Sequence, residues 1–202
     1  MGKISEEEVW DTIAEKWEEF RKRPVPEVLE FLKDKKGKIL DLGCGTGRHL
    51  QKINGIKFFG IDFSEKMLRF AEKKIKKENI EAVLVKSDMS KLPFSDDYFD
   101  YAIFIRSLHC IPSKKAREKS LRELYRVLKP KAKSLIQVWS KSHERLKNKE
   151  KGDYIPWTIN NRQIQRYYYI YEQNEIQDLL EKVGFKILKI NEDKNITIVV
   201  EK

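Results

Sequence analysis

The feature that most constrains the fold is an alternation of short apolar runs with amphipathic segments between residues 37 and 139. The apolar runs have the length and the β-branched or aromatic content of buried strands. They read KILDLG, KFFGID, EAVLVKSD, YAIFIRS and KSLIQVWS. We expect helices between them at Arg48–Ile53, Ser64–Lys77 and Lys114–Leu128. This alternation predicts an α/β fold, in which helices cover both faces of a parallel sheet.

The flanking segments show three different patterns. Two helices are expected before the sheet, the first between Ser5, a candidate N-cap, and Pro24, and the second from Pro26 to Asp34. Residues 140–171 are polar, basic and aromatic, with the clean period of neither a strand nor a helix. A helix at Asn174–Val183 and a terminal β-hairpin follow. We expect one domain over residues 1–202: N-terminal helices (1–36), core (37–139), substrate-binding insertion (140–171), and C-terminal helix and hairpin (172–202).

Charge favours one class of partner. Lys and Arg outnumber Asp and Glu by 42 to 32, which gives a formal net charge of +10 and favours polyanions such as nucleic acid. The alternative is a Lys/Glu-rich surface of the kind found in heat-adapted proteins. Two cysteines and three scattered histidines predict neither a disulfide framework nor a metal site. The acidic, amphipathic start and the lack of a long apolar run predict a cytoplasmic protein without a membrane partner.

The glycine-rich stretch DLGCGTG, residues 41–47, follows the first expected strand directly. Its spacing, D-x-G-x-G-x-G, differs from the G-x-G-x-x-G of dinucleotide folds. Asp62 ends the next strand, where a carboxylate can accept both hydroxyls of a ribose. Asp88 and Met89 follow the third strand and offer an acceptor and an apolar face to an adenine. The predicted cofactor-binding residues are Asp41, Gly43, Cys44, Gly45, Gly47, Asp62, Phe63, Asp88, Met89 and Ile105.

The runs ILDLGCGTG, GIDFS, SDMSKLPF, DDYFDYAIF and RELYRVLKP resemble the class I S-adenosylmethionine-dependent methyltransferases over about residues 37–139. The resemblance implies S-adenosyl-L-methionine as the cofactor. It also implies a Rossmann-like, seven-stranded, mostly parallel sheet of order 3-2-1-4-5-7-6. One departure is Lys131-Ala132, where the family usually has two glycines, in a loop far from the cofactor.

The flanks EVWDTIAEKWEEFRKRPVPEVLEFL, IRSLHCIPSKKARE, IQVWSK, GDYIPW and RYYYIYEQNEIQDLL resemble one subfamily. It is that of the tRNA wobble-uridine methyltransferases, which esterify 5-carboxymethyluridine to its methyl ester. Arg21 matches the Arg of the subfamily's T-R-Y-K-P-W-P motif, and His109 matches the first His of a His-His pair. Trp139 lies in its V-W motif. The departures at Phe20 (usually Thr), Val25 (usually Trp) and Cys110 (usually His) leave the exact acceptor open.

The chemistry that the resemblance implies is suited to a carboxylate acceptor. A carboxylate is already an anion at neutral pH, so the enzyme needs no general base and must chiefly position one oxygen. Arg21 and Arg106 are the candidates to hold the other oxygen, and His109 to orient the acceptor or stack on the base. Two alternatives stay open: Arg21 pairs with Glu18 or another nearby acid, or His109 is a satisfied loop histidine.

The aromatic and basic residues of the insertion suit RNA, because single-stranded bases stack on aromatic rings and cations grip the backbone. The alternative is that these rings mainly pack the insertion against the sheet, and we expect Tyr169 or Tyr171 to be core. The predicted RNA-binding residues are Trp139, Lys147, Trp157, Arg162, Arg166, Tyr167 and Tyr168.

Partners and rival functions complete the expectations. With the family's strand order, EAVLVKS lies at the sheet edge and is a candidate docking site for the small zinc-binding activator protein with which family members often work. The alternative is an edge guarded by Lys76, Lys77 and Lys86. The leading function is methylation of the carboxylate of wobble 5-carboxymethyluridine in tRNA. Its rivals are a methyltransferase for a small-molecule acid or other metabolite and a non-catalytic, RNA-binding subunit.

Overall fold

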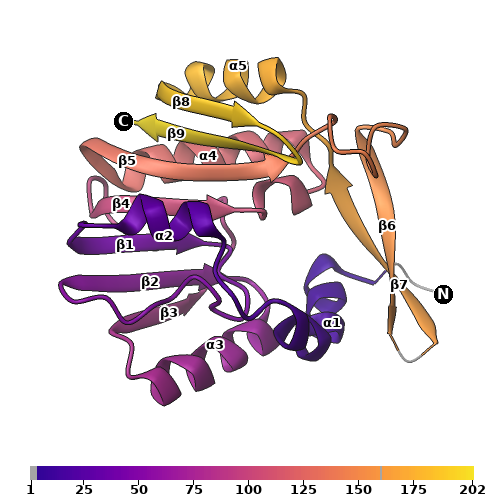
Figure 1. The fold of residues 1–202 in the computed structure, drawn as a ribbon, viewed down its shortest axis with the longest axis horizontal. Helices are drawn as coiled ribbons and strands as arrows, with labels where there is room; N and C mark the ends of the chain where they lie inside the picture. Colours follow the sequence, from indigo (N-terminus) through magenta and orange to yellow (C-terminus); the bar gives the residue numbers. More distant parts are fainter. Residues whose placement is uncertain (1–3, 160) are drawn as a thin grey trace.

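A mostly parallel seven-stranded sheet forms the centre of the molecule (Figure 1). The computed structural model describes residues 4–159 and 161–202; residues 1–3 of the expected N-terminal part and Asn160 of the expected insertion lie outside the described residues. The strands of this sheet are β1 (Gly37–Leu42), β2 (Ile56–Asp62), β3 (Ala82–Lys86), β4 (Phe99–Ile105), β5 (Leu128–Trp139), β8 (Lys186–Glu192) and β9 (Asn195–Glu201). They are ordered β3-β2-β1-β4-β5-β9-β8. The first five are parallel, and the hairpin β8–β9 adds antiparallel to β5. The expected order is confirmed.

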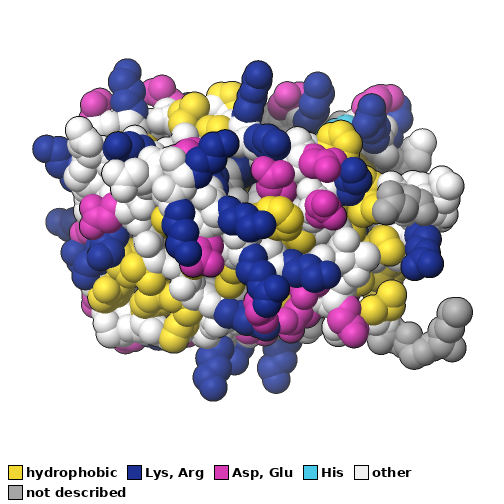
Figure 2. All heavy atoms as spheres, turned by 90° about the horizontal axis from the view of Figure 1, so that it is seen from below, with side chains coloured by type: hydrophobic (Ala, Val, Ile, Leu, Met, Phe, Trp, Pro, Cys, Tyr) yellow, Lys and Arg dark blue, Asp and Glu magenta, His cyan; other side chains and the backbone are white. Residues whose placement is uncertain are grey.

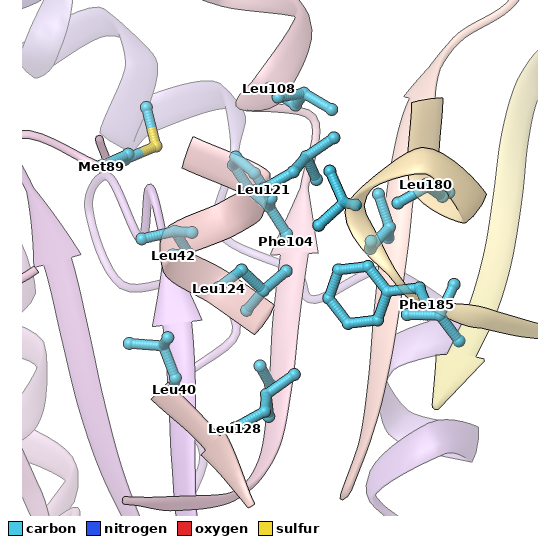
Figure 3. Packing of buried hydrophobic residues seen from close by; sticks show 14 of the residues in the cluster. Leu40, Leu42, Met89, Phe104, Leu108, Leu121, Leu124, Leu128, Leu180 and Phe185 are labelled. Atoms are coloured by element: carbon cyan, nitrogen blue, oxygen red, sulfur yellow. The ribbon is translucent and has the colours of Figure 1, made fainter. Parts of the chain in front are cut away.

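Helices cover both faces of the sheet because successive side chains of its strands point to opposite sides and are apolar on both. On one face lie α4 (Lys114–Val127) and α5 (Gln173–Val183), and on the other lie α2 (Pro26–Leu32) and α3 (Glu65–Glu78). Figure 3 shows Leu124 and Leu180, from the two helices of the first face, packed near Phe104 and Phe185. The expected helices at these places are confirmed, including the end of α5 at Gly184, whose φ is 116°.

Two further elements gather at the carboxyl ends of the parallel strands (Figure 1). Helix α1 (Glu6–Phe20) begins with the predicted N-cap: the backbone N–H of Glu8 donates to Ser5 Oγ over 3.2 Å. A separate two-stranded hairpin consists of β6 (Gly152–Ile159) and β7 (Arg162–Tyr169). Trp17 of α1 meets Trp157 of β6 edge to face, with ring centroids 5.4 Å apart. These two elements form the wall beside the site described below.

The helix expected at Arg48–Ile53 was wrong, because the chain forms only turns there. The side-chain amide of Gln51 donates to the carbonyl oxygens of Arg48 and Leu50, at 3.0 and 2.9 Å, and so competes for groups that a helix would use. The segment is also short, since Gly47 and Gly55 bound it with φ of 78° and 82°. A stable helix would need more length than these glycines leave.

The segment that showed no clean periodicity is a hairpin, so the expectation that it fits no strand was wrong. Exposure does alternate along β6, but its exposed positions include Tyr154 and Pro156, and the inward ones include Asp153. Apolar residues on the outward face therefore mask the two-residue period. The hairpin pairs Tyr154 with Tyr167, whose rings meet edge to face at 5.6 Å.

Strand β3 forms an edge of the sheet, as expected. Val83 on this strand is 38% exposed. Lys86 at its end is an ion-pair partner of Glu7, at 2.8 Å, and of Glu65, at 3.7 Å. Within the described residues, no helix combines the length and the apolar character needed to cross a membrane.

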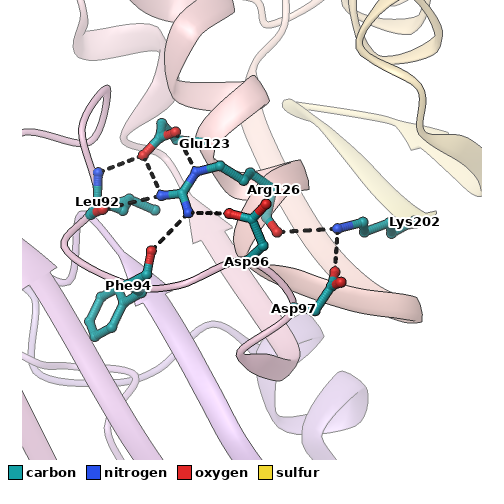
Figure 4. A network of polar contacts seen from close by, with 7 residues as sticks. All are labelled: Leu92, Phe94, Asp96, Asp97, Glu123, Arg126 and Lys202. Atoms are coloured by element: carbon teal, nitrogen blue, oxygen red, sulfur yellow. Dashed lines mark hydrogen bonds and ion pairs between the residues drawn. The ribbon is translucent and has the colours of Figure 1, made fainter.

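Arg126 of α4 fastens the loop that connects β3 to β4 (Figure 4). Its guanidinium donates to the carbonyl oxygens of Phe94 and Leu92, at 2.8 and 3.2 Å, and pairs with Asp96 and Glu123. The backbone N–H of Leu92 donates in turn to Glu123 over 2.7 Å. These bonds hold in place the loop that carries Met89, one of the predicted cofactor residues.

Candidate functional site

The glycine loop after β1 brings backbone into the site. At Gly43, with φ of 75°, a Cβ atom would collide with the side chain of Ser107, which donates to the Gly43 carbonyl over 3.0 Å. At Gly45, with φ of 54°, the nearest atom to a Cβ would be Nε1 of Trp17, 3.8 Å away, so this glycine faces open space. At Gly47, with φ of 78°, a Cβ atom would lie 3.0 Å from Ala71 of α3, so this glycine lets the loop pack closely against that helix.

Asp62 ends β2 with a well-supported carboxylate. Its two oxygens accept from the backbone N–H groups of Gly45 and Ser64, both at 2.9 Å. Burial raises the pKa of this carboxyl to about 6, against the lowering effect of those bonds. Ser64 Oγ donates to Asp11 Oδ1 over 2.5 Å and so ties α1 to this strand end. Backbone hydrogen bonds therefore orient the carboxylate, which borders the pocket that is described below.

Asp41 lies beneath the glycine loop. It is buried, and neither carboxylate oxygen has a hydrogen-bond partner among the described residues. His49 Nδ1 lies 3.9 Å from Asp41 Oδ2, but burial holds the pKa of His49 well below its ordinary value, so this imidazole is neutral and offers no counter-charge. Burial raises the pKa of Asp41 to about 7, with the Arg48 cation opposing the shift. Asp41 does not line this pocket. We therefore expect it to affect a ligand by its electrostatic field, across the glycine loop, and not by direct contact.

A pocket opens between the glycine loop and α1, and we call it the cofactor pocket. It unites seven of the predicted residues with Trp10 and Trp17 of α1, with Arg48, and with the predicted Arg106. A neighbouring hollow of about 740 Å³ shares Phe63 and Met89 with it and is bordered by Asp88. The predicted residues that line the cofactor pocket are Gly43, Cys44, Gly45, Asp62, Phe63, Met89 and Ile105.

These residues fit an adenosine bearing an amino-acid chain. Asp62 presents a carboxylate to ribose hydroxyls, and the backbone at Gly43 and Gly45 allows a close approach. Phe63 and Met89 supply apolar faces for the purine. The unpaired, buried charge of Asp41 favours a cationic group, such as an ammonium, nearby.

A second hollow, which we call the acceptor hollow, lies beyond α1 and measures about 470 Å³. Arg48 and Arg106 line both this hollow and the cofactor pocket, and Arg21 joins them in the acceptor hollow. Burial lowers the pKa of Arg48 to about 10, and the cations Arg106 and Arg21 add to the shift. Burial and Arg21 also lower the pKa of Arg106. The three guanidinium groups concentrate positive charge beside the cofactor pocket, because arginine side chains stay charged in proteins.

None of these three guanidinium groups has an ion-pair partner within 4.0 Å among the residues that the structure describes. The alternative expectation for Arg21, a pair with Glu18, is not what the chain forms. Glu18 pairs with Lys22 at 3.7 Å, and the Arg21 guanidinium lies 5.5 Å from the ring centroid of Trp17. Their charges are therefore available to an anion.

A buried neighbour, Gln137, orients Arg106. Its backbone has a φ of 56°, a conformation that non-glycine residues rarely adopt, and its Nε donates to Gln137 Oε1 over 2.7 Å. The amide nitrogen of Gln137 donates to Glu27 and to Thr197, at 3.1 and 2.9 Å. These bonds turn the amide oxygen of Gln137 toward Arg106, so the arginine is held from behind.

His109 is buried behind the site. Its Nδ1 accepts from the backbone N–H of Trp139 over 3.0 Å. Burial, together with the Arg106 cation, lowers its pKa to about 3, so the imidazole is neutral at neutral pH. It lies near the rings of Trp139 and Tyr168, and it is not among the residues lining the two hollows. This geometry matches the alternative of a satisfied loop histidine.

Four of the seven predicted RNA-binding side chains form a packed cluster: Trp139, Trp157, Arg166 and Tyr168. The rings of Tyr168 and Trp139 stack with centroids 4.2 Å apart, and Tyr168 is 1% exposed. Arg166 donates to the Tyr168 hydroxyl over 2.6 Å and lies 4.8 Å from the ring centroid of Trp157. Buried side chains offer no surface to a base, so the structure places Arg166 and Tyr168 in packing roles. Tyr171, expected as core, is 1% exposed.

The other predicted RNA-binding residues do not converge. Lys147 lies in the loop before the hairpin and pairs with Glu144 at 2.6 Å. Arg162 is exposed at the far end of the hairpin, and Tyr167 is half-buried against Tyr154. These three residues therefore do not form a single basic and aromatic face in the described part of the insertion.

Several site residues were missed by sequence reasoning. Arg48 directly follows the glycine loop, and that position was the only signal for it. Trp10 and Trp17 lie seven residues apart on α1, a spacing that also fits the apolar side of an ordinary helix. Phe20 is 68% exposed beside the acceptor hollow, with its ring 6.4 Å from that of Trp157. An exposed phenylalanine next to free arginines is a ready stacking surface.

The described part of the chain contains no candidate metal site. Among the described residues, no group of three or more His, Cys, Asp or Glu side chains is arranged to hold an ion.

Comparison with known proteins identifies the kind of domain. Residues 39–131 match a family model described as a methyltransferase domain. The chain is 28% identical to the tRNA (carboxymethyluridine(34)-5-O)-methyltransferase of Schizosaccharomyces pombe, over 96% of this chain and 95% of that protein. It is 35% identical to the protein of the same name from Arabidopsis thaliana, over 67% of this chain but only 33% of the relative's length. A solved S-adenosylmethionine-dependent methyltransferase from Methanosarcina mazei shares the fold, with a TM-score of 0.71, 21% identity and coverage of 89% and 98%.

Proposed function

Because this chain is an S-adenosylmethionine-dependent methyltransferase with the class I fold, we propose that it methylates the carboxylate of 5-carboxymethyluridine at the wobble position of tRNA. The observation that carries the proposal is the acceptor hollow, where Arg21, Arg48 and Arg106 converge without acidic partners beside the cofactor pocket. The names of the two relatives agree with this acceptor.

In the proposed reaction, the protein's main task is to place the acceptor. Bound S-adenosylmethionine supplies an electrophilic methyl group. A carboxylate oxygen is a sufficient nucleophile without deprotonation, so the neutral, buried His109 is not needed as a base. Arg106 and Arg21 hold the far oxygen of the carboxylate by charge-assisted hydrogen bonds, and so direct the near oxygen toward the cofactor pocket.

The cations also select the protonation state and the class of the acceptor. Arg48 and Arg106 are half-buried, where a charge interacts more strongly with a counter-charge than it does in water. They therefore favour an ionised acid over a neutral amide or alcohol. Phe20 offers its exposed ring to the uracil. Since the hollow measures about 470 Å³, it is within the range of small-ligand pockets and suits one nucleoside.

The resemblance also implies a small zinc-binding activator protein, and we include its docking at β3 in the proposal. The strand is at the edge of the sheet and leaves Val83 38% exposed. An unpaired strand edge can accept another strand. Lys86, expected as a guard of this edge, is already engaged by Glu7 and Glu65.

The test is transfer of a labelled methyl group from S-adenosylmethionine to tRNA that carries 5-carboxymethyluridine. Unmodified tRNA is the control, and each reaction is run with and without the activator. The proposal predicts label on the modified tRNA alone, released by mild alkali as expected for an ester. Label on neither RNA, despite measurable binding of the methyl donor, would contradict it and favour a small-molecule acid as the acceptor.

A further inference from the structure

A strongly basic groove, which we call the α1–α3 groove, lies beside the acceptor hollow. Its lining holds six basic side chains and two acidic ones. Figure 2 looks at the molecule from the side of α3 and shows Lys and Arg side chains spread over the middle of this face. The residues that line the groove are Glu18, Arg21, Lys22, Thr46, Arg48, Phe70, Lys73, Lys74, Lys77 and Glu78.

The two acidic residues of the groove are already engaged. Glu18 pairs with Lys22 at 3.7 Å, and Glu78 pairs with Lys74. Lys73 and Lys77 have no carboxylate within 4.0 Å among the described residues, and the same holds for Arg21 and Arg48. Four cations in one groove are thus left without a counter-charge.

Local helix stability does not explain this arrangement. Along α3, three ion pairs of i,i+4 spacing already join its acids and bases: Arg69 with Glu65, Lys76 with Glu72, and Lys74 with Glu78. Lys73 and Lys77 take part in none of these three ion pairs, and they are themselves four residues apart. Two like charges at this spacing destabilise a helix slightly. Lys73 lies 5.3 Å from the ring centroid of Phe70 on the same helix, but neither lysine has an acidic partner there, so both charges remain available to an anion.

The groove is continuous with the acceptor hollow. Arg21 and Arg48 line both, and Arg48 also lines the cofactor pocket. When the base of a nucleotide occupies the acceptor hollow, the backbone on one side of that nucleotide must leave across a neighbouring surface. The α1–α3 groove is such a surface, and its charge matches that of phosphodiesters.

We propose that the α1–α3 groove binds the sugar–phosphate backbone of the tRNA that flanks the methylated nucleotide. This inference rests on the proposed function and assigns to it a backbone-binding surface distinct from the hairpin. The insertion is a poor candidate because Arg166 of its hairpin is buried between rings and Lys147 of its preceding loop is paired with Glu144. The groove contributes affinity without reading sequence, as phosphate contacts do.

The experiment compares the salt dependence of tRNA binding for the wild-type protein and for Lys73→Gln/Lys77→Gln. Removing two phosphate contacts is expected to weaken binding roughly tenfold at low salt and to lower the slope of log K against log salt by about 1 to 2. Unmodified tRNA serves as the probe, so the result does not depend on methyl transfer. An unchanged slope would overturn the proposal.

The matched control is Lys115→Gln/Lys119→Gln. These two lysines have the same spacing and exposure but lie on α4, on the opposite face of the sheet. The control variant is expected to bind tRNA as the wild type does. An equal loss in both variants would mean a general effect of net charge and would also overturn the proposal.

A second readout separates this inference from the proposed function. A trinucleotide with 5-carboxymethyluridine at its centre is too short to follow the groove and is expected to be methylated equally by the wild type and the Lys73/Lys77 variant. If no carboxymethyl substrate is methylated but tRNA binding still depends on Lys73 and Lys77, the proposed methyl acceptor is wrong. The proposal that the groove binds the tRNA backbone is then still supported. If tRNA is methylated but its binding ignores the groove, only the groove proposal fails. A wild-type protein that binds no tRNA overturns the groove.

Discussion

At the residue scale, two buried carboxyl groups determine how the cofactor pocket responds to pH. Asp62 borders the pocket and has a pKa raised to about 6, and Asp41 lies beneath the loop with a pKa raised to about 7. Burial is the main cause of both shifts. The site therefore holds less negative charge at mildly acidic pH than its sequence implies.

Replacing Asp62 tests its contact with the methyl donor. Asp62→Ala removes the acceptor for the ribose hydroxyls and the support of the Gly45 and Ser64 backbone, so affinity for S-adenosylmethionine is expected to fall at least tenfold. Calorimetric titration measures the affinity, and circular dichroism checks the fold. Asp62→Asn, which keeps the shape, separates charge from support. Normal affinity in the alanine variant would refute the assignment.

The affinity for the methyl donor is expected to fall as pH is lowered from 8 to 5. Protonation neutralises Asp41 first, near pH 7, and then Asp62, near pH 6. Both pKa values are raised, so both carboxyls take up protons within this range. The ionised carboxylates, present at high pH, attract the cationic methyl donor, and the protonated carboxyls, present at low pH, do not. Titrations across this range measure the effect. Asp41→Asn is expected to remove the part near pH 7; a flat wild-type profile would contradict the prediction.

Arg106 is expected to act through its geometry and not only its charge. Arg106→Lys keeps a cation but loses the planar fork and the bond from Nε to Gln137 Oε1. Methyl transfer to the RNA acceptor is expected to fall roughly tenfold or more in kcat/KM, at about 1.4 kcal/mol per factor of ten. The KM for S-adenosylmethionine is expected to stay within about twofold, since Asp62 and the glycine loop are untouched. A selective rise in that KM instead would assign Arg106 to the cofactor.

At the element scale, the hairpin β6–β7 is a packing element before it is a binding surface. Trp157 packs against α1, and Tyr168 stacks on Trp139 at the end of β5. The hairpin thereby braces α1, which supplies Trp10 and Trp17 to the cofactor pocket. Loss of hairpin contacts would loosen the pocket wall.

Arg166→Ala is therefore expected to affect stability more than RNA binding. The change removes a buried guanidinium that contacts two rings and donates to Tyr168, which should lower the free energy of unfolding by about 1 to 3 kcal/mol. Chemical denaturation measures this. Arg162→Ala, at an exposed position of the same strand, is the matched control and should change stability by less than about 0.5 kcal/mol. If the Arg166 variant is as stable as the wild type and its tRNA binding depends less on salt concentration, the prediction is wrong and the hairpin contacts RNA.

At the scale of the whole molecule, the sheet topology assembles the acceptor hollow. Arg48 follows β1 and Arg106 follows β4, and these two strands are neighbours at the point where the strand order reverses. Ligands of open α/β sheets bind at such switch points, outside the carboxyl ends of the strands. Arg21 comes from the end of α1, which crosses the same edge. Segments far apart in the chain thus concentrate cations without ion-pair partners in one place.

The strands of the seven-stranded sheet and seven residues that line the cofactor pocket could be predicted from short-range patterns of the sequence, whereas the strand order was implied by the resemblance to a methyltransferase family. Apolar runs of strand length, helical spacing and a glycine loop directly after a strand report on neighbouring residues of the chain. Asp62 is one such case, since a residue at the end of a strand in a parallel sheet faces the ligand edge. The failed helix at Arg48–Ile53 shows the limit of this reasoning, because a single side chain, Gln51, competes for its backbone.

Only the tertiary structure decided which charges converge and which rings are buried. Tyr168 and Tyr167 are neighbours in the sequence, yet only Tyr168 meets Trp139 and is shielded from water. Arg166 is buried because it packs against the rings of the same cluster. Arg48 belongs to the acceptor hollow because Arg21 and Arg106, from other parts of the chain, line the same hollow. Burial and electrostatic fields sum over all neighbours in space, whereas sequence periodicity reports only on neighbours along the chain.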